Sequence, residues 1–299
     1  LAVAAFGVPA RADGPMPVVA SFSILADLVA EIGKDRVSVT TLVGPNGDAH
    51  VFQPKPADAH MVASAEVVFA NGLGFEGWID RLIAASGTRA AIVVASTGVT
   101  PNPAEADEEH DAHAAEGGHH DHGAFDPHAW QAVANVKIYV GNIRDALIAA
   151  DPAGKDAYAA AATAYLAELD TLEGEVRAAM AKVPVEKRRV ITTHDAFGYF
   201  GKAYGIEFLA PQGISTDAEP TAKGVAELVR QIRREHIRAV FIENMSDGRL
   251  VKQIAKETGV KLGGELFSDS LSPKGGPAST YVDMVRHNTR LLTAAMVDS

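Results

Sequence analysis

The stretch from Asp107 to Trp130 concentrates the residues of this sequence that are best able to do chemistry. It reads DEEHDAHAAEGGHHDHGAFDPHAW and holds six of the eleven histidines of the chain. Imidazole is the commonest metal ligand in proteins, and a short histidine-rich tract is typical of metal binding. The plainer alternative is a solvated polar loop with chance histidines. The density of histidines favours a metal-binding segment.

Composition restricts both the metal and the partner. The chain has no cysteine, so any bound metal must be held by nitrogen and oxygen donors. Such donors favour zinc, manganese or similar ions over copper(I) and iron–sulfur clusters. The formal net charge is −11 and there is no basic run, which excludes nucleic acid as an expected partner.

The first residues, LAVAAFGVPARA, resemble the end of a secretory signal peptide that is cleaved after Ala12. A disordered apolar N-terminus is the alternative interpretation. Without cysteine there is no lipid-attachment residue near the cleavage site, and no later stretch is long and apolar enough to span a bilayer. We therefore expect an exported, soluble, monomeric periplasmic protein without a lipid anchor.

Strand and helix patterns alternate along the chain, which predicts an α/β fold with mostly parallel sheets. Short runs rich in β-branched residues predict strands at 17–22, 37–43, 67–70, 91–95, 189–193, 206–209 and 239–242. Helical periodicity predicts helices at 23–32, 57–64, 78–85, 132–149, 196–204, 222–235, 248–258 and 280–297.

One predicted helix, 153–182, is longer than a small domain needs. Its apolar residues recur at helical spacing and form a single stripe, with Gly174 as its weak point. Asp151 is its expected N-cap, Pro152 its first residue, and Pro184 ends it. We interpret this helix as a rigid spine joining two lobes. The expected division is a signal remnant at 1–12, an N-terminal lobe at 13–151 with a histidine-rich loop at 107–123, a linking helix at 152–183 and a C-terminal lobe at 184–299.

Ligands of α/β sheets gather at the loops that follow the carboxyl ends of strands. Four such loops carry a candidate metal ligand, two from each half of the chain: His50, His128, His194 and Asp269. Three imidazoles and one carboxylate make a four-coordinate set suited to zinc. Each residue also has a simpler interpretation: the histidines could be surface residues, and Asp269 could be a helix cap.

Asp195 and Glu243 could act behind these ligands. A carboxylate often accepts the second N–H of a metal-bound imidazole and fixes the ring orientation. For Glu243, a buried structural ion pair is an equal alternative. Glu243 is also the one residue that could serve as general base if the protein were a zinc hydrolase. Four protein ligands leave no open coordination position, and the H-E-x-x-H motif is absent, so we expect no enzyme.

The motifs around these residues are similar to those of the metal-specific solute-binding proteins of bacterial ABC importers. The resemblance rests on GPNGDAHVFQPKPAD, FDPHAW, TTHDAFGYFGKAYGI, and FIENMSDGRLVKQIAKETGVK leading to LFSDSL, in this order along nearly the whole chain. It implies two α/β lobes joined by a long helix, a metal in the cleft between them, and an ABC permease as partner. Many relatives have Asp-Pro or Glu-Pro before the first histidine, where this chain has Asp48-Ala49.

The resemblance also implies which metal is bound. Manganese binders of this group typically have a carboxylate where His194 stands and lack a histidine-rich loop, so Zn²⁺ is expected and Mn²⁺ is the alternative. The loop of zinc importers implies an accessory role in collecting zinc, with a periplasmic zinc chaperone as a further candidate partner. We assign that accessory role to His110, His113, His119, His120 and His122, and place His128 in the fixed site.

Overall fold

The computed structural model describes residues 14–104, 124–217, 219–235, 237 and 239–297. The predicted signal remnant and the five accessory histidines of the 107–123 segment lie outside the described residues. Within the described part, the elements for which a range was predicted have boundaries within about two residues of that range, whereas the strand Lys261–Leu266 had no predicted range.

The first half of the chain builds one parallel sheet in the order β2-β1-β3-β4. The central strands are almost wholly buried because they are covered on both faces, whereas most residues of the edge strand β4 are exposed. The strands are β1 (Met16–Phe22), β2 (Val37–Val43), β3 (Val67–Ala70) and β4 (Ala91–Val94), and the helices are α1 (Ser23–Gly33), α2 (Pro56–Ala63), α3 (Ile79–Ser86) and α4 (Val133–Ala150).

The second half builds another parallel sheet in the corresponding order, β6-β5-β7-β8. Two lobes with the same strand order confirm the predicted two-lobed α/β fold. The strands are β5 (Arg189–Ile191), β6 (Glu207–Leu209), β7 (Ala239–Glu243) and β8 (Lys261–Leu266), and the helices are α6 (Gly198–Tyr204), α7 (Ala222–Glu235), α8 (Arg249–Thr258) and α9 (Tyr281–Val297).

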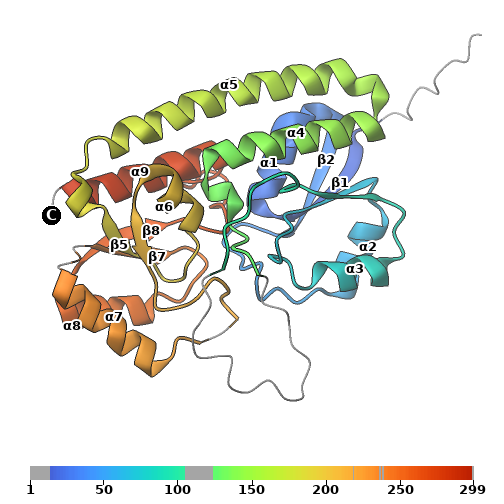
Figure 1. The fold of residues 1–299 in the computed structure, drawn as a ribbon. Coiled ribbons are helices and arrows are strands. Elements are labelled where there is room, and N and C mark those ends of the chain that lie inside the picture. The colour runs from blue at the N-terminus through green and yellow to red at the C-terminus, as the bar shows by residue number, and fades with distance from the viewer. Residues whose placement is uncertain (1–13, 105–123, 218, 236, 238, 298–299) are drawn as a thin grey trace, which may run out of the picture.

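The helix α5 (Lys155–Met180) runs along both lobes and connects them (Figure 1). Its 26 residues span about 39 Å at the usual rise per residue. The predicted apolar stripe is buried against α1, α4 and α9, while Gly174 is exposed and the helix continues through it.

The start of this spine differs from the prediction. A short 3-10 turn, Pro152–Gly154, precedes α5, and no side-chain cap is formed by Asp151. The Asp151 carboxylate instead accepts hydrogen bonds from Arg36 and from the hydroxyl of Tyr158. The competing ion pair with Arg36 explains why the capping prediction failed.

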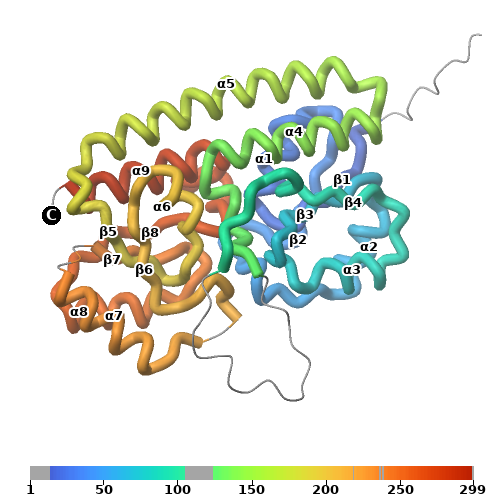
Figure 2. The backbone as a smooth tube through the Cα atoms, in the orientation of Figure 1, coloured from blue at the N-terminus to red at the C-terminus, as the bar shows by residue number. Residues whose placement is uncertain are grey.

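The two lobes share one hydrophobic core. A single cluster of buried side chains extends from β1 and β3 through α4 and α5 to α9 and the inner face of the second sheet. A smaller cluster fills the space between that sheet and α7 and α8. The helices α1, α4, α5 and α9 therefore lie side by side along one edge of the molecule (Figure 2). A shared core resists large rotations of one lobe against the other.

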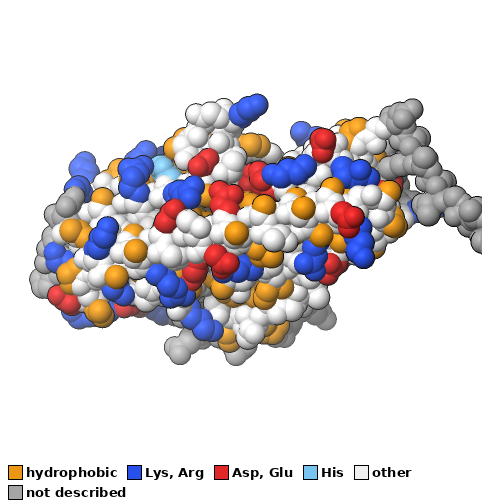
Figure 3. Space-filling model, turned by 90° about the horizontal axis from the view of Figure 1, so that it is seen from above, with side chains coloured by type: hydrophobic (Ala, Val, Ile, Leu, Met, Phe, Trp, Pro, Cys, Tyr) orange, Lys and Arg blue, Asp and Glu red, His pale blue; other side chains and the backbone are white. Residues whose placement is uncertain are grey.

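The face over α5 mixes acidic and basic side chains, with apolar ones scattered between them (Figure 3). None of the helices in the described part of the chain is long and apolar enough to cross a membrane.

Candidate metal centre

The four predicted ligands meet at the boundary between the lobes. They follow the strands β2, β4, β5 and β8, and one possible ligand atom from each lies within 4.8 Å of every other. The side chains of His128, His194 and Asp269 are fully buried, and His50 exposes 4% of its side chain. Among the described residues, these four form the one such group of metal-binding side chains.

The carboxylate of Asp269 lies at the centre of the group. Its Oδ2 is 3.1 Å from Nε2 of His194 and 3.2 Å from Nε2 of His50. Its Oδ1 is 3.5 Å from Nε2 of His128, and the Nε2 atoms of His50 and His128 are 3.3 Å apart. All three imidazoles therefore point the same ring nitrogen towards one carboxylate.

These separations suit a small divalent cation. Zinc bonds of about 2.0–2.1 Å in a tetrahedron place neighbouring donor atoms about 3.3–3.4 Å apart. The measured separations of 3.1–3.5 Å bracket that value. In addition, Oδ1 of Asp269 is buried without a hydrogen-bond partner, which is costly unless a cation faces it. The donors thus form a metal-binding site.

Burial and neighbouring charges act in opposite directions on the pKa values of the clustered side chains. Burial lowers the pKa of His50. Burial also opposes protonation of His128, but the charges of Asp269 and Asp126 outweigh it and raise the pKa of this imidazole to about 9. Burial disfavours the charged form of Asp269, yet His128 and His194 hold the pKa of its carboxyl well below the usual range. The Asp269 carboxylate is therefore ionised.

Each ligating histidine is held at its backbone by a carboxylate. The N–H of His50 donates to Asp48 and the N–H of His128 donates to Asp126, both at 2.9 Å. The N–H of His194 donates to Oε1 of Glu243 at 3.0 Å, and the same oxygen accepts the N–H of Thr193. These bonds fix the loops before any metal arrives.

Two of these carboxylates also reach an imidazole ring. Oδ1 of Asp126 lies 2.7 Å from Nδ1 of His128. Oε2 of Glu243 lies 2.6 Å from Nδ1 of His194, within ion-pair distance. Asp195, the other residue expected behind the ligands, is half-buried, and its backbone N–H donates to the carbonyl of Gly213.

Asp126 and Asp48 are functional residues that the sequence interpretation missed. Both precede a ligating histidine by two positions, in Asp48-Ala49-His50 and Asp126-Pro127-His128. An Asp side chain readily accepts the backbone N–H two residues on, so this spacing was the available signal.

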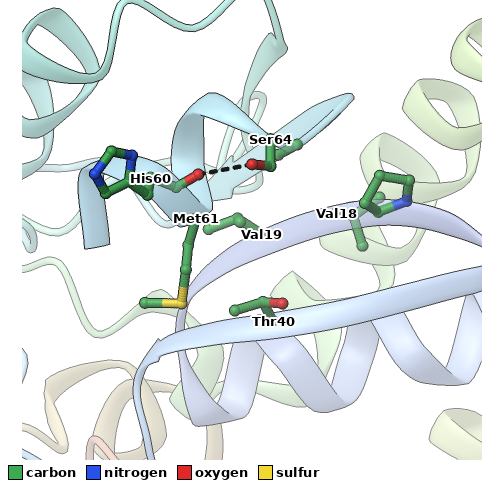
Figure 4. A pocket seen from close by; sticks show the side chains of 8 residues that line it. Val18, Val19, Thr40, His60, Met61 and Ser64 are labelled. Atoms are coloured by element: carbon green, nitrogen blue, oxygen red, sulfur yellow. Dashed lines mark hydrogen bonds between the residues drawn. The ribbon is translucent and has the colours of Figure 1, made fainter. Parts of the chain in front are cut away.

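A separate groove lies between α2 and the strands β1 and β2, with a volume of about 330 Å³ (Figure 4). Its lining includes His60 and Met61 from α2 and Thr40 from β2. His60 is exposed, and none of the four clustered ligands lines the groove.

The fold and the site together define a class. Two parallel-sheet α/β lobes, one long connecting helix and a buried three-histidine, one-aspartate site between them are the features of a metal-binding component of an ABC importer. Residues 18–295 match the family model "ZnuA: Zinc-uptake complex component A periplasmic". This chain belongs to that family, whose members are extracytoplasmic substrate-binding proteins that work with a membrane permease and are not enzymes. The hydrolase alternative is therefore excluded.

The relatives differ in the metal that their names give. The manganese-binding lipoprotein MntA of Halalkalibacterium halodurans is 32% identical over 273 residues, covering 91% of this chain and 86% of the relative. The iron-binding protein YfeA of Yersinia pestis is 32% identical over 268 residues, covering 90% and 82%. The periplasmic zinc-binding protein TroA of Treponema pallidum has a similar structure, with a TM-score of 0.85, 30% identity and coverage of 95% and 99%.

Proposed function

We propose that this protein captures Zn²⁺ outside the cytoplasmic membrane and delivers it to an ABC permease. In this proposal His50, His128, His194 and Asp269 are the ligands of one tight zinc site. The two lobes would be residues 13–151 and 184–299, joined by the spine at 152–183. Zinc is the cargo here and takes no part in a reaction.

The donor set carries the proposal. Three imidazole nitrogens and one carboxylate oxygen, 3.1–3.5 Å apart, suit tetrahedral zinc. Manganese is a harder ion that is better served by several oxygen donors. By the family resemblance, manganese binders carry a carboxylate where His194 stands. The imidazole at this position therefore supports zinc.

Manganese import is the second candidate, and the names of relatives favour it. Two relatives at 32% identity are named manganese-binding lipoproteins, from Halalkalibacterium halodurans and Bacillus subtilis. Those names also describe lipoproteins, so the expectation that this chain lacks a lipid anchor stays a prediction.

Competition between the two ions separates the candidates. The metal-free chain is titrated with Zn²⁺ and with Mn²⁺, each against a chelator of known affinity, and each loaded form is then challenged with the other ion. Because the general order of divalent ions already places Zn²⁺ above Mn²⁺ at nitrogen donors, tighter zinc binding alone is not sufficient. Zinc import requires that Zn²⁺ displaces bound Mn²⁺ at equal concentration and that the protein isolated from cells supplied with both ions carries Zn²⁺. Equal affinities, or a preference for Mn²⁺, would reject the zinc assignment.

The five histidines from His110 to His122, both included, are proposed to bind further zinc ions weakly and to pass them to the tight site. The permease, and a periplasmic zinc chaperone, are the proposed partners. Because the lobes share a core, release would require the permease to disturb the ligands themselves. We propose that the protein acts as a monomer.

A further inference from the structure

The hydroxyl of Tyr199 makes a contact that crosses the boundary between the lobes. Tyr199 lies on α6, five residues after His194, and is 4% exposed. Its hydroxyl donates to the backbone carbonyl of Asp126 and accepts the backbone N–H of Asn102, both at 3.0 Å. A residue of the C-terminal lobe thus satisfies two backbone groups of the N-terminal lobe.

Those two backbone groups belong to a short antiparallel pair of chain segments, 102–104 and 124–126. The N–H of Asp126 donates to the carbonyl of Asn102, and the N–H of Ala104 donates to the carbonyl of Ala124. Pro103 and Phe125 form an isolated bridge between these bonds. Tyr199 therefore closes this pair at the end nearest to the metal site, beside Asp126.

Asp126 is the link from this pair to the metal site. Its Oδ1 accepts the backbone N–H of His128 and lies 2.7 Å from the Nδ1 of the same residue. Its Oδ2 faces Gly198 at the start of α6, where a Cβ atom would come within 2.7 Å of that oxygen. The carboxylate is thus confined by α6 on one side and by His128 on the other.

We propose that Tyr199 is a positioning residue for the metal ligand His128. By holding the Asp126 backbone, its hydroxyl keeps the carboxylate in line with Nδ1 of His128, so that Nε2 stays directed at the ion. The inference rests on metal binding by the four clustered residues, but not on which ion they prefer. Through α6, the C-terminal lobe that supplies His194 thereby also orients the N-terminal ligand His128.

Tyr199→Phe removes only the hydroxyl and keeps the ring in the core. The Asp126 carbonyl and the Asn102 N–H then lose this hydrogen-bond partner, and the loss is costly because both residues are buried or half-buried. Residues that orient a ligating imidazole typically change metal affinity by about 10–100-fold when they are lost. We expect the change mainly in the rate of metal release, because the ligand atoms themselves remain.

Tyr204 supplies a matched control on the same helix. It is 5% exposed, and its hydroxyl donates to Glu173 on α5 and contacts the backbone N–H of Val133 at the start of α4, so it makes no bond within the stretch from Asp126 to His128. Release of Zn²⁺ from the wild-type chain, Tyr199→Phe and Tyr204→Phe is followed with excess chelator, and separately release of Mn²⁺. We expect Tyr199→Phe to release the retained ion about tenfold faster or more, and Tyr204→Phe to match the wild type.

A second readout tests positioning directly. In protein labelled at histidine nitrogens, the Nδ1 proton of His128 should exchange with water faster in Tyr199→Phe than in Tyr204→Phe. Gly198→Ala should give the same signature, because the added Cβ displaces Oδ2 of Asp126 while Tyr199 is unchanged. Equal release rates for the two tyrosine variants, or unchanged exchange at His128, would overturn the proposal. Retention of Mn²⁺ in preference to Zn²⁺ would reject the zinc assignment and leave this comparison valid.

Discussion

The indole N–H of Trp130 donates a 2.9 Å hydrogen bond to the backbone carbonyl of Ser268. Trp130 follows His128 by two residues, and Ser268 immediately precedes Asp269. The side-chain amide of Gln131 donates to the same carbonyl at 2.7 Å. Ligands from opposite lobes are therefore joined through one peptide group, which supports the geometry of the site before metal binds.

Trp130→Phe should weaken metal binding without abolishing it. The aromatic contacts with Phe22 and Phe75 can largely persist, but the Ser268 carbonyl keeps only the bond from Gln131. We expect a stability loss of about 1–2 kcal/mol in urea unfolding and a several-fold faster release of zinc. If release were unchanged while stability fell, Trp130 would serve the core alone.

His194→Ala should reduce zinc affinity by several orders of magnitude, because it removes one of four donors from a buried site. The matched control is His60→Ala, which changes an exposed histidine on α2 outside the cluster. Chelator competition measures both affinities. Comparable affinity in the two variants would remove His194 from the ligand set.

Glu243→Gln should lower zinc affinity by about 10–100-fold while the chain stays folded. The amide oxygen can still accept the N–H groups of Thr193 and His194, but the negative charge beside Nδ1 of His194 is lost. Glu76→Gln is the control, since Glu76 is a buried carboxylate that accepts the N–H of Asn71. The Gln side chain keeps an oxygen for that N–H, and Glu76 lies outside the ligand cluster, so this variant should bind zinc like the wild type.

Deletion of residues 108–123 should leave one tight zinc ion and remove the weaker ones. The tight ligands all lie outside the deleted segment, and the flanking residues Ala104 and Ala124 are joined by a backbone hydrogen bond. Isothermal titration with zinc gives the stoichiometry of each class. Loss of the tight site in the deletion variant would contradict the proposed division between collecting and retaining residues.

The free energy of unfolding of the metal-free protein should fall as the pH rises from about 4 to about 7, because of the carboxyl of Asp27. Burial raises the pKa of this carboxyl from 3.8 to about 7, and its Oδ2 accepts the N–H of Tyr281 at the start of α9. Between those values the folded chain holds a proton that the unfolded chain has lost, so the free energy of unfolding falls with rising pH.

The contribution of Asp27 to the free energy of unfolding is fully present below about pH 4 and is lost once the pH exceeds about 7. Between these values the free energy of unfolding falls by at most about 1.4 kcal/mol per pH unit. Asp27→Asn keeps an acceptor for Tyr281 and should flatten this part of the profile. Urea unfolding of both proteins at about pH 5 and about pH 7.5 measures the difference. Parallel profiles would show that another group titrates.

Much of the fold was accessible from the sequence. The alternation of strand and helix patterns, and the long apolar stripe from Tyr158 to Met180, predicted two α/β lobes and a spine. The predicted N-cap role of Asp151 was wrong because capping is a local preference, whereas the ion-pair partner Arg36 is distant in sequence. The residues next to Asp151 in the chain do not predict that ion pair.

The candidate site was accessible in part for a related reason. Carboxyl ends of parallel strands converge on one edge of a sheet, so strand-end histidines could be nominated without coordinates. The sequence predicted less well the contacts made by Asp126, Glu243 and Tyr199. Many polar residues lie in loops and at helix starts, and only the packing of the folded chain determines which of them contacts a ligand or a residue that holds it.

The types of donor atom follow from the sequence alone: nitrogen and oxygen without sulfur, and a histidine-rich segment beside α/β strand ends. The three-dimensional packing shows that both sheets have the same strand order, that one core serves both lobes, and that Asp269 lies among three imidazoles. Donor type and helical or strand periodicity are local properties of a chain, whereas distances of about 3 Å between His50 and Asp269 depend on every packed layer between them.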